Sequence, residues 1–158
     1  MDGALAGAVA GAAATAPMTA VMTLLRREFS DARREEIPPR QITRRIAQTA
    51  GVEPQLDAEQ VHAATYFAHV GYGATTGALY PAFAARVRGP TVVKGALFGL
   101  AVWGASYLGW LPALRILRPA TREPAGRNTM MIAAHLVWGA STALLTGALD
   151  RPATPPRL

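Results

Sequence analysis

Long uncharged stretches alternate with short charged ones along this chain. Four windows contain no Asp, Glu, Lys or Arg: residues 3–25, 60–85, 95–114 and 128–149. Each is at least 20 residues long, which is the length that an α-helix needs to cross the hydrocarbon core of a bilayer. All 26 formal charges lie outside these windows. The pattern therefore predicts four transmembrane helices in an all-α integral membrane bundle.

The long connection over residues 26–59 predicts one more helix. Prolines at 38 and 39 stop the first helix, because proline is tolerated in a helix only at its first turn. Beyond them, residues 40–51 place Ile42, Ile46 and Ala50 on one face. We expect a short amphipathic helix on the membrane surface, with its arginines near anionic headgroups. A purely solvated loop is the alternative.

The remaining connections contain recognisable boundary signals. Asp57 followed by Gln60 is typical of a capping box at the start of the second span. The tail over 151–158 holds three prolines and is expected to be extended. No part of the chain is long enough for a separate extramembrane domain, so we predict a single membrane domain over 1–158.

Composition adds a packing hypothesis. The first window carries Gly3, Gly7 and Gly11 at four-residue spacing, which forms a ridge of small residues that lets two helix backbones approach closely. We expect this ridge to pack inside the bundle rather than to make a homodimer. The chain has no cysteine, which excludes disulfides and thiolate metal sites.

The net charge of +6 predicts topology rather than nucleic-acid binding, because the basic residues flank the spans instead of forming a module. Loops 26–59 and 115–127 hold seven and four arginines, whereas the other side of a four-span protein receives five basic residues. Short basic loops stay in the cytoplasm, which places both termini outside. The expected surroundings are lipid, with a membrane-protein partner or a homo-oligomer as further options.

Polar residues inside the spans form stripes at helical spacing. The second window contributes His62, Tyr66, His69, Gly73, Thr76 and Tyr80. The fourth window contributes Asn128, His135, Gly139, Thr142 and Thr146. Such residues are costly in lipid and normally face the interior of a bundle.

Two histidines are expected at the same depth in the membrane. With each window centred on the bilayer and a rise of ~1.5 Å per residue, His69 and His135 each lie ~5 Å from the midplane on the same side. Tyr107 of the third window lies within a turn of this level. The candidates for ligand or proton handling are His69, His135, Tyr107, Asn128, Tyr66 and Thr142.

The chemistry open to this layer is limited. Two imidazoles can relay a proton, bind a small ligand, or ligate a b-type haem, and the plainer alternative is that each bonds a neighbour and fixes the helix register. One histidine pair is too few ligands for a structural metal site. No nucleophile or acid lies near the histidines and no phosphate-binding glycine loop occurs, so an enzyme is disfavoured.

The fourth window resembles a known motif. Asn128 precedes His-Leu-Val-Trp at 135–138 by seven residues, and this looks like the fourth-span motif of the YagU-like family of small bacterial inner-membrane proteins. The segment from His69 to Tyr80, and Pro-Pro-Arg at 38–40, are similar to further stretches of that family. The resemblance implies a four-span inner-membrane protein and adds no reaction.

The leading hypothesis is a non-enzymatic accessory subunit or small transporter-like module with a polar layer around His69 and His135. No cofactor is required by it. The alternative is a redox protein in which these two histidines are the axial ligands of haem b.

Overall fold

The computed structural model describes residues 2–29 and 36–150, and within these ranges every regular element is helical. The predicted extended tail over 151–158 lies outside the described residues. The longer elements are α1 (Gly3–Glu28), α3 (Pro38–Thr49), α4 (Ala58–Gly77), α5 (Tyr80–Ala84), α6 (Thr91–Gly104), the π-helix η2 (Ala105–Trp110), α7 (Leu111–Ala113) and α8 (Ala125–Leu149). Single 3-10 turns, η1 (Glu53–Gln55) and η3 (Ala120–Arg122), lie in the connections.

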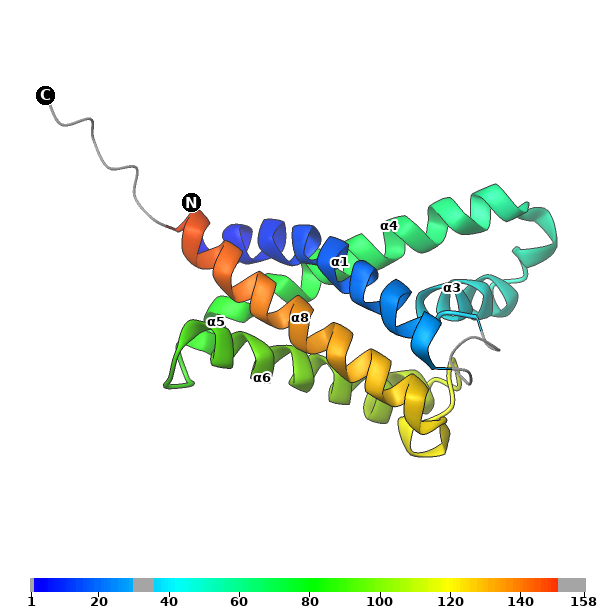
Figure 1. Cartoon of the computed structure of the whole chain (residues 1–158). Helices are drawn as coiled ribbons and strands as arrows, with labels where there is room; N and C mark the ends of the chain where they lie inside the picture. Colours follow the sequence, from blue (N-terminus) through cyan, green and yellow to red (C-terminus); the bar gives the residue numbers. More distant parts are fainter. Residues whose placement is uncertain (1, 30–35, 151–158) are drawn as a thin grey trace, which may run out of the picture.

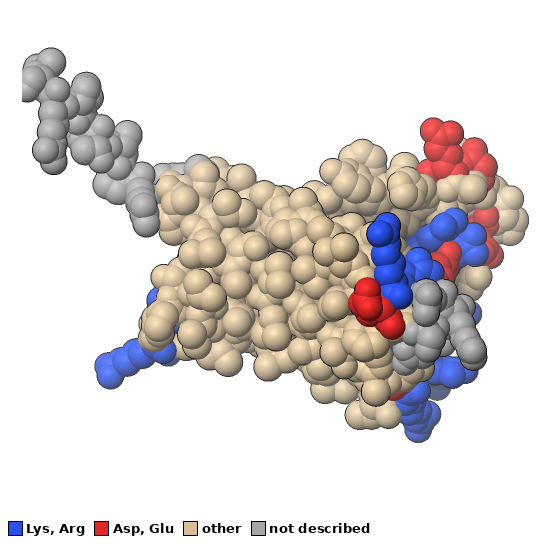
Figure 2. Space-filling model, in the orientation of Figure 1, with Lys and Arg blue, Asp and Glu red and all other residues tan. Residues whose placement is uncertain are grey.

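Helices α1, α4, α6 and α8 run in alternating directions along the molecule (Figure 1). Helix α8 packs between α1 and α6, while α4 packs against α1 and α3. One end of the molecule therefore carries α3 and the connection between η2 and α8, and the other carries the turn between α5 and α6. Charged residues gather toward these ends and leave an uncharged band between them (Figure 2).

Three helical segments of the described chain are long and apolar enough to cross a membrane: Gly3–Glu28, Thr91–Ala113 and Ala125–Leu149. They correspond to the first, third and fourth predicted spans. The second differs, because the window 60–85 is broken into α4 and α5. Helix α4 has 20 residues but includes Glu59, His62 and His69, which lower its hydropathy. Length and composition support a membrane protein with three such helices.

The break after Gly77 follows from Pro81. A proline lacks the N–H that would bond the carbonyl four residues earlier, so the carbonyl of Gly77 loses its helical partner. The chain turns through Ala78 and Leu79, with Leu79 N–H bonded to Thr76 O at 3.0 Å, before α5 begins. The other boundary signals of this region are confirmed: Asp57 and Gln60 form a capping box at the start of α4.

Two seams of glycines bring helix backbones together. A Cβ at Gly77 would lie 2.7 Å from Gly11 Cα, and a Cβ at Gly73 would lie 2.8 Å from Gly11 O, so α1 and α4 meet where neither bears a side chain. A Cβ at Gly139 would lie 2.8 Å from Gly99 Cα in the second seam, between α6 and α8. Gly7 also lies against Gly77, whereas Gly3 lies against the ring of Pro81.

The amphipathic segment after the proline pair is a helix. Pro38 and Pro39 occupy the first turn of α3, where a missing N–H costs nothing. Thr43 and Ala47 are buried one turn apart, on the side that packs against α4. The arrangement of α3 relative to a membrane surface stays a prediction.

Candidate functional site

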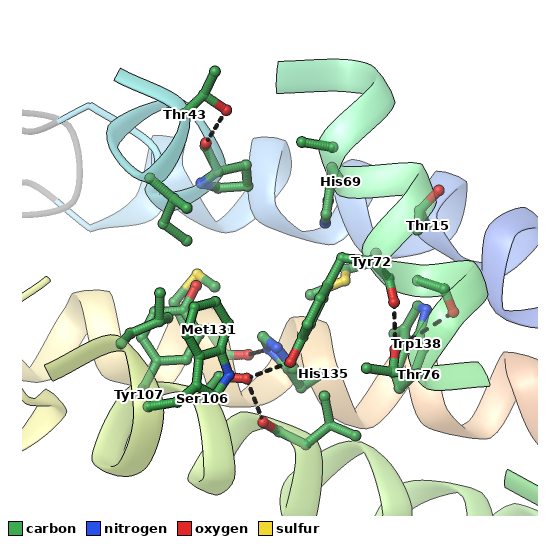
Figure 3. Close-up of a pocket in the computed structure, with 18 of the residues that line it drawn as sticks. Thr15, Thr43, His69, Tyr72, Thr76, Ser106, Tyr107, Met131, His135 and Trp138 are labelled. Atoms are coloured by element: carbon green, nitrogen blue, oxygen red, sulfur yellow. Dashed lines mark hydrogen bonds between the residues drawn. The ribbon is translucent and has the colours of Figure 1, made fainter. Parts of the chain in front are cut away.

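A cavity of about 320 Å³ lies between α4 and the helices α6, η2 and α8, with α1 and α3 completing its wall (Figure 3). Its apolar lining includes Met18, Ile42 and Leu111. Its polar or polar-tipped lining consists of Thr15, Thr43, His69, Tyr72, Thr76, Ser106, Tyr107, Trp110, His135 and Trp138. None of the described residues that line the cavity is Asp, Glu, Lys or Arg.

The cavity arises because α4 diverges from the rest of the bundle. The glycine seam holds the C-terminal half of α4 against α1, and the N-terminal half runs outward toward α3 (Figure 1). One hydrogen bond crosses the resulting gap, between Tyr72 Oη and Ser106 Oγ at 2.8 Å. The rings of Tyr72 and Trp110 also approach, with centroids 6.1 Å apart. The two sides of the cavity are thus joined across its middle.

The π-helix η2 supplies the wall opposite α4. Its widened turns place the adjacent residues Ser106 and Tyr107, together with Trp110, on the cavity lining. Gly109 has φ −106° and ψ −106°, which marks the kink inside this segment. π-Helical turns are rare and occur frequently at functional sites.

His135 is a buried polar residue of the lining, with 5% of its surface exposed. Its Nδ1 lies 2.8 Å from Met131 O, one turn earlier in α8. The Tyr107 ring meets the imidazole edge to face at a centroid distance of 5.8 Å. Helix geometry and an aromatic neighbour therefore fix the ring of His135 in one orientation.

His69 reaches the same cavity from the opposite side. It lies on α4, one turn before Gly73, and Figure 3 shows its ring directed into the space between α4 and α8. The structure thus places His69, His135 and Tyr107, which are predicted on three different spans, around a single cavity.

The other three candidates lie elsewhere. Tyr66 is 62% exposed and lines a shallower pocket between α1 and α4. Asn128 donates from Nδ2 to Ala120 O at 2.7 Å and fastens the connection before α8. Thr142 is fully buried and donates to Trp138 O at 2.8 Å within its own helix. Each of these side chains has a local structural partner or an outward position.

Two cavity residues, Tyr72 and Ser106, escape the sequence analysis, and Trp138 enters it only as the last residue of the motif at 135–138. Tyr72 and Ser106 form the bond across the cavity, and Trp138 donates from Nε1 to Gly11 O at 3.0 Å, which ties α8 to α1. The signal for Tyr72 is its spacing, because it lies three residues after His69 and four before Thr76. No local pattern identifies Ser106, because its position depends on the π-helical turn.

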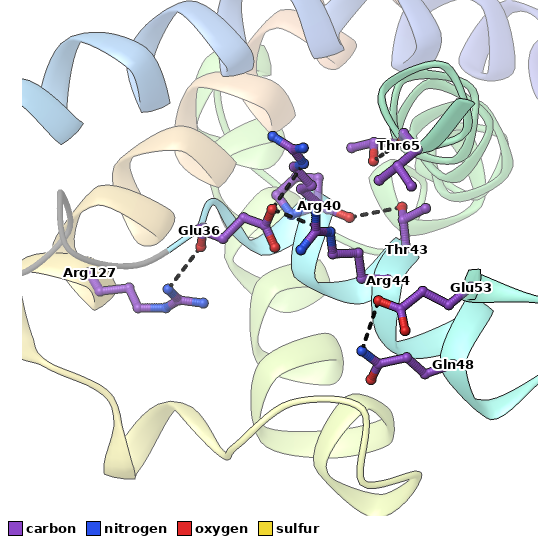
Figure 4. Close-up of polar contacts among 10 residues, drawn as sticks. Glu36, Arg40, Thr43, Arg44, Gln48, Glu53, Thr65 and Arg127 are labelled. Carbon is purple, nitrogen blue, oxygen red and sulfur yellow. Dashed lines mark hydrogen bonds and ion pairs between the residues drawn. The ribbon is translucent and has the colours of Figure 1, made fainter. Parts of the chain in front are cut away.

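A buried arginine holds α3 beside the cavity. Arg127 is 5% exposed and donates to Glu36 O at 3.3 Å (Figure 4). It also donates to Gln41 Oε1, and its Nε pairs with Glu123 at 3.3 Å. Glu36 also pairs with Arg40 at 2.9 Å. The start of α8 is thereby fastened to α3, whose Ile42 and Thr43 line the cavity.

The chemistry available to the cavity follows from this lining. Residues 2–29 and 36–150 contain no group of three or more His, Cys, Asp or Glu that could hold a metal ion. Two imidazoles, several hydroxyls and four aromatic rings face a space of small-molecule size. Such a lining can accept or donate hydrogen bonds and stack on a flat ring, and it offers no charge to an ionic ligand.

Comparison with known proteins gives a match to a protein family. A family model described as Protein of unknown function (DUF1440) matches residues 26–144, from the end of α1 into α8. No curated protein and no solved structure matches the chain.

Proposed function

The chain belongs to the family described as Protein of unknown function (DUF1440), and from that premise we propose that it is a non-enzymatic membrane module that binds a small ligand. The binding site is the cavity around His69 and His135. The single observation that carries this proposal is that both histidines, from α4 and α8, line one cavity with Tyr107. Proton handling at the two imidazoles belongs to the same proposal.

The proposed setting is the bacterial inner membrane with four crossings. Helices α1, α4, α6 and α8 alternate in direction, and α4 would be the least apolar crossing. The resemblance to YagU-like proteins supports this location. Arg127 joins the connections 26–59 and 115–127 at one end of the molecule, and their basic residues favour the cytoplasmic side for that end.

Filling the cavity tests the proposal. Ala68 lines the cavity on α4 and Ala63, on the same helix, does not line it. We expect native mass spectrometry of the gently solubilised protein to detect a bound small molecule in the wild type and in Ala63→Phe. The species should be absent from Ala68→Phe, His69→Ala and His135→Ala. A wild-type protein without any bound species, or one that Ala68→Phe retains at full occupancy, contradicts the proposal.

The haem alternative rests on the same observation, because axial ligation by two histidines requires both imidazoles at one cavity. The absorption spectrum separates the two. A Soret band that disappears in His69→Ala and in His135→Ala supports haem, and a colourless protein with a bound small molecule supports the leading proposal.

A further inference from the structure

The polar groups of the cavity have already used most of their hydrogens. Thr15, Thr43 and Thr76 each donate to a carbonyl three or four residues earlier in their own helix, at 2.7–3.0 Å. A carbonyl oxygen can only accept, so each hydroxyl hydrogen is committed. The lone pairs of these three oxygens remain available as acceptors.

The bond across the cavity has a defined direction. Ser106 Oγ donates to Val102 O at 2.7 Å, which uses its one hydrogen. Tyr72 must therefore be the donor in its 2.8 Å bond to Ser106 Oγ. The Tyr72 oxygen then has no hydrogen left for a ligand, yet its own lone pairs can still accept.

Two further lining residues that donate within the protein, His135 and Trp138, lie on α8. His135 Nδ1 faces Met131 O at 2.8 Å and must carry the hydrogen, so in the neutral ring Nε2 is an acceptor. The Nε1 hydrogen of Trp138 is used by Gly11 O. Seven of the ten polar lining residues thus already donate their hydrogen to an acceptor within the protein. Among the described contacts, only His69, Tyr107 and Trp110 donate no such hydrogen bond.

A ligand that brings its own hydrogen-bond donor therefore finds more partners in this lining than a ligand that brings only acceptors, because the donors that remain are those of His69, Tyr107 and Trp110. The lining favours an uncharged ligand, because neither a cation nor an anion would find a counter-charge among the described lining residues. The rings of Tyr72, Tyr107, Trp110 and Trp138 line the space and favour a flat aromatic partner.

We propose that the cavity selects an uncharged aromatic ligand of the phenol class, whose hydroxyl donates to His135 Nε2 or to a hydroxyl oxygen of the lining. The inference rests on the proposed function and specifies its ligand. The ether of the same ring fills the space equally well but leaves the acceptors unpaired, which is the basis of selection.

A matched pair of probes tests the selectivity. Saturable binding of 2-naphthol and of 2-methoxynaphthalene is measured by calorimetry on the full chain in nanodiscs, with empty nanodiscs as the baseline. We expect 2-naphthol to bind about tenfold more tightly, as the loss of one hydrogen bond in a buried site implies. Both probes should lose saturable binding in Ala68→Phe and retain it in Ala63→Phe.

The variant His135→Phe examines the acceptor. It keeps a flat ring beside Tyr107 but removes Nε2, so the preference for 2-naphthol should fall severalfold while the ether still binds, which shows that the variant is folded. Equal affinities of the wild type for the two probes would overturn the donor selectivity and leave the ligand-binding function standing. Absence of saturable binding for both probes would overturn the phenol-class ligand, whereas the binding function itself is overturned only by a wild type without a bound species in native mass spectrometry.

Discussion

At the scale of the residue, Arg127 has a buried structural role that the sequence pattern does not predict. It lies in the first turn of α8, just before the uncharged window 128–149. From the sequence alone it is one of the four arginines of the connection 115–127. The fold buries it and surrounds it with Glu36 O, Gln41 and Glu123. Whether an arginine is solvated or enclosed depends on which connection folds over it, and that is not a local property.

Removing this side chain should destabilise the α3 end of the molecule. For Arg127→Met we expect a loss of about 2–3 kcal/mol, because buried partners of the guanidinium lose charge-assisted hydrogen bonds. The measurement is the thermal unfolding midpoint in detergent. Arg44→Met is the matched control, since Arg44 pairs with the same Glu36 but its side chain is 43% exposed. Its expected effect is under about 1 kcal/mol, and equal losses for both variants would contradict the assigned role.

The bond between Tyr72 and Ser106 makes a second prediction at this scale. Tyr72→Phe and Ser106→Ala each remove one partner of the contact that joins α4 to η2. A double-mutant cycle should give a coupling energy of about 1 kcal/mol, measured from unfolding midpoints. Additive losses from the two variants would show that the two hydroxyls do not interact.

The cavity residues show how far a sequence stripe can be trusted. His69 is on the predicted stripe and faces the cavity, whereas Tyr66, on the same stripe, is exposed. At about 100° per residue, Tyr66 and Tyr72 lie about 60° to either side of His69. Helical periodicity therefore finds the face but not which of its two flanks lines the cavity. The fold decides that: Tyr72 lines the cavity, and Tyr66 lies beside α1 in the shallower pocket.

At the scale of the element, the glycine seams set the positions of the long helices. In lipid there is little hydrophobic force between helices, so close packing of backbones has to hold them. Gly11 meets Gly73 and Gly77, and Gly99 meets Gly139, at distances that leave no room for a methyl group. The four-residue spacing in the first window indicates such a seam, but its partner helix becomes known only from the fold.

A matched glycine pair on α4 tests the seam. Gly77→Ala forces a Cβ to within 2.7 Å of Gly11 Cα, and we expect a loss of about 1–3 kcal/mol from overpacking. Gly71→Ala on the same helix meets nothing within 4 Å, and it should be neutral or stabilise by up to about 1 kcal/mol through helix propensity. Unfolding midpoints in detergent compare them. A Gly77→Ala protein as stable as Gly71→Ala would rule out a tight seam.

The elements themselves were largely predictable. Uncharged windows locate α1, α6 with η2, and α8, and the proline pair locates α3. The second window was predicted as one span over 60–85, and the missing N–H of Pro81 divides it near Gly77. The π-helical turns of η2 were not predictable, because they depend on packing against neighbours rather than on a local motif.

At the scale of the whole molecule, the number of crossings determines where each connection lies. With four crossings, the connections around Gln48 and Arg118 share one side of the membrane, and the turn at Arg88 lies on the other. If α4 did not cross, Arg88 would lie on the side of Gln48 and opposite Arg118.

The cysteine-free chain makes this testable without background labelling. Gln48, Arg118 and Arg88 are exposed, so single cysteines at these positions should react with any maleimide that reaches their side of the membrane. In spheroplasts, a membrane-impermeant maleimide should label Arg88→Cys and leave Gln48→Cys and Arg118→Cys unlabelled until permeabilisation. Labelling of Gln48→Cys together with Arg88→Cys in intact spheroplasts would exclude a crossing by α4.

The sequence by itself indicated a membrane environment and located the long helices, because the cost of placing a charge in lipid is a local property that appears directly in the spacing of charged residues. It also indicated that His69, His135 and Tyr107 lie at similar depths, since rise per residue is fixed by helix geometry. The tertiary structure alone decided that these three line one cavity, that Tyr72 and Ser106 join its walls and that Arg127 is enclosed. Those outcomes depend on which helix surfaces meet, and contacts between segments far apart in the chain leave no local trace.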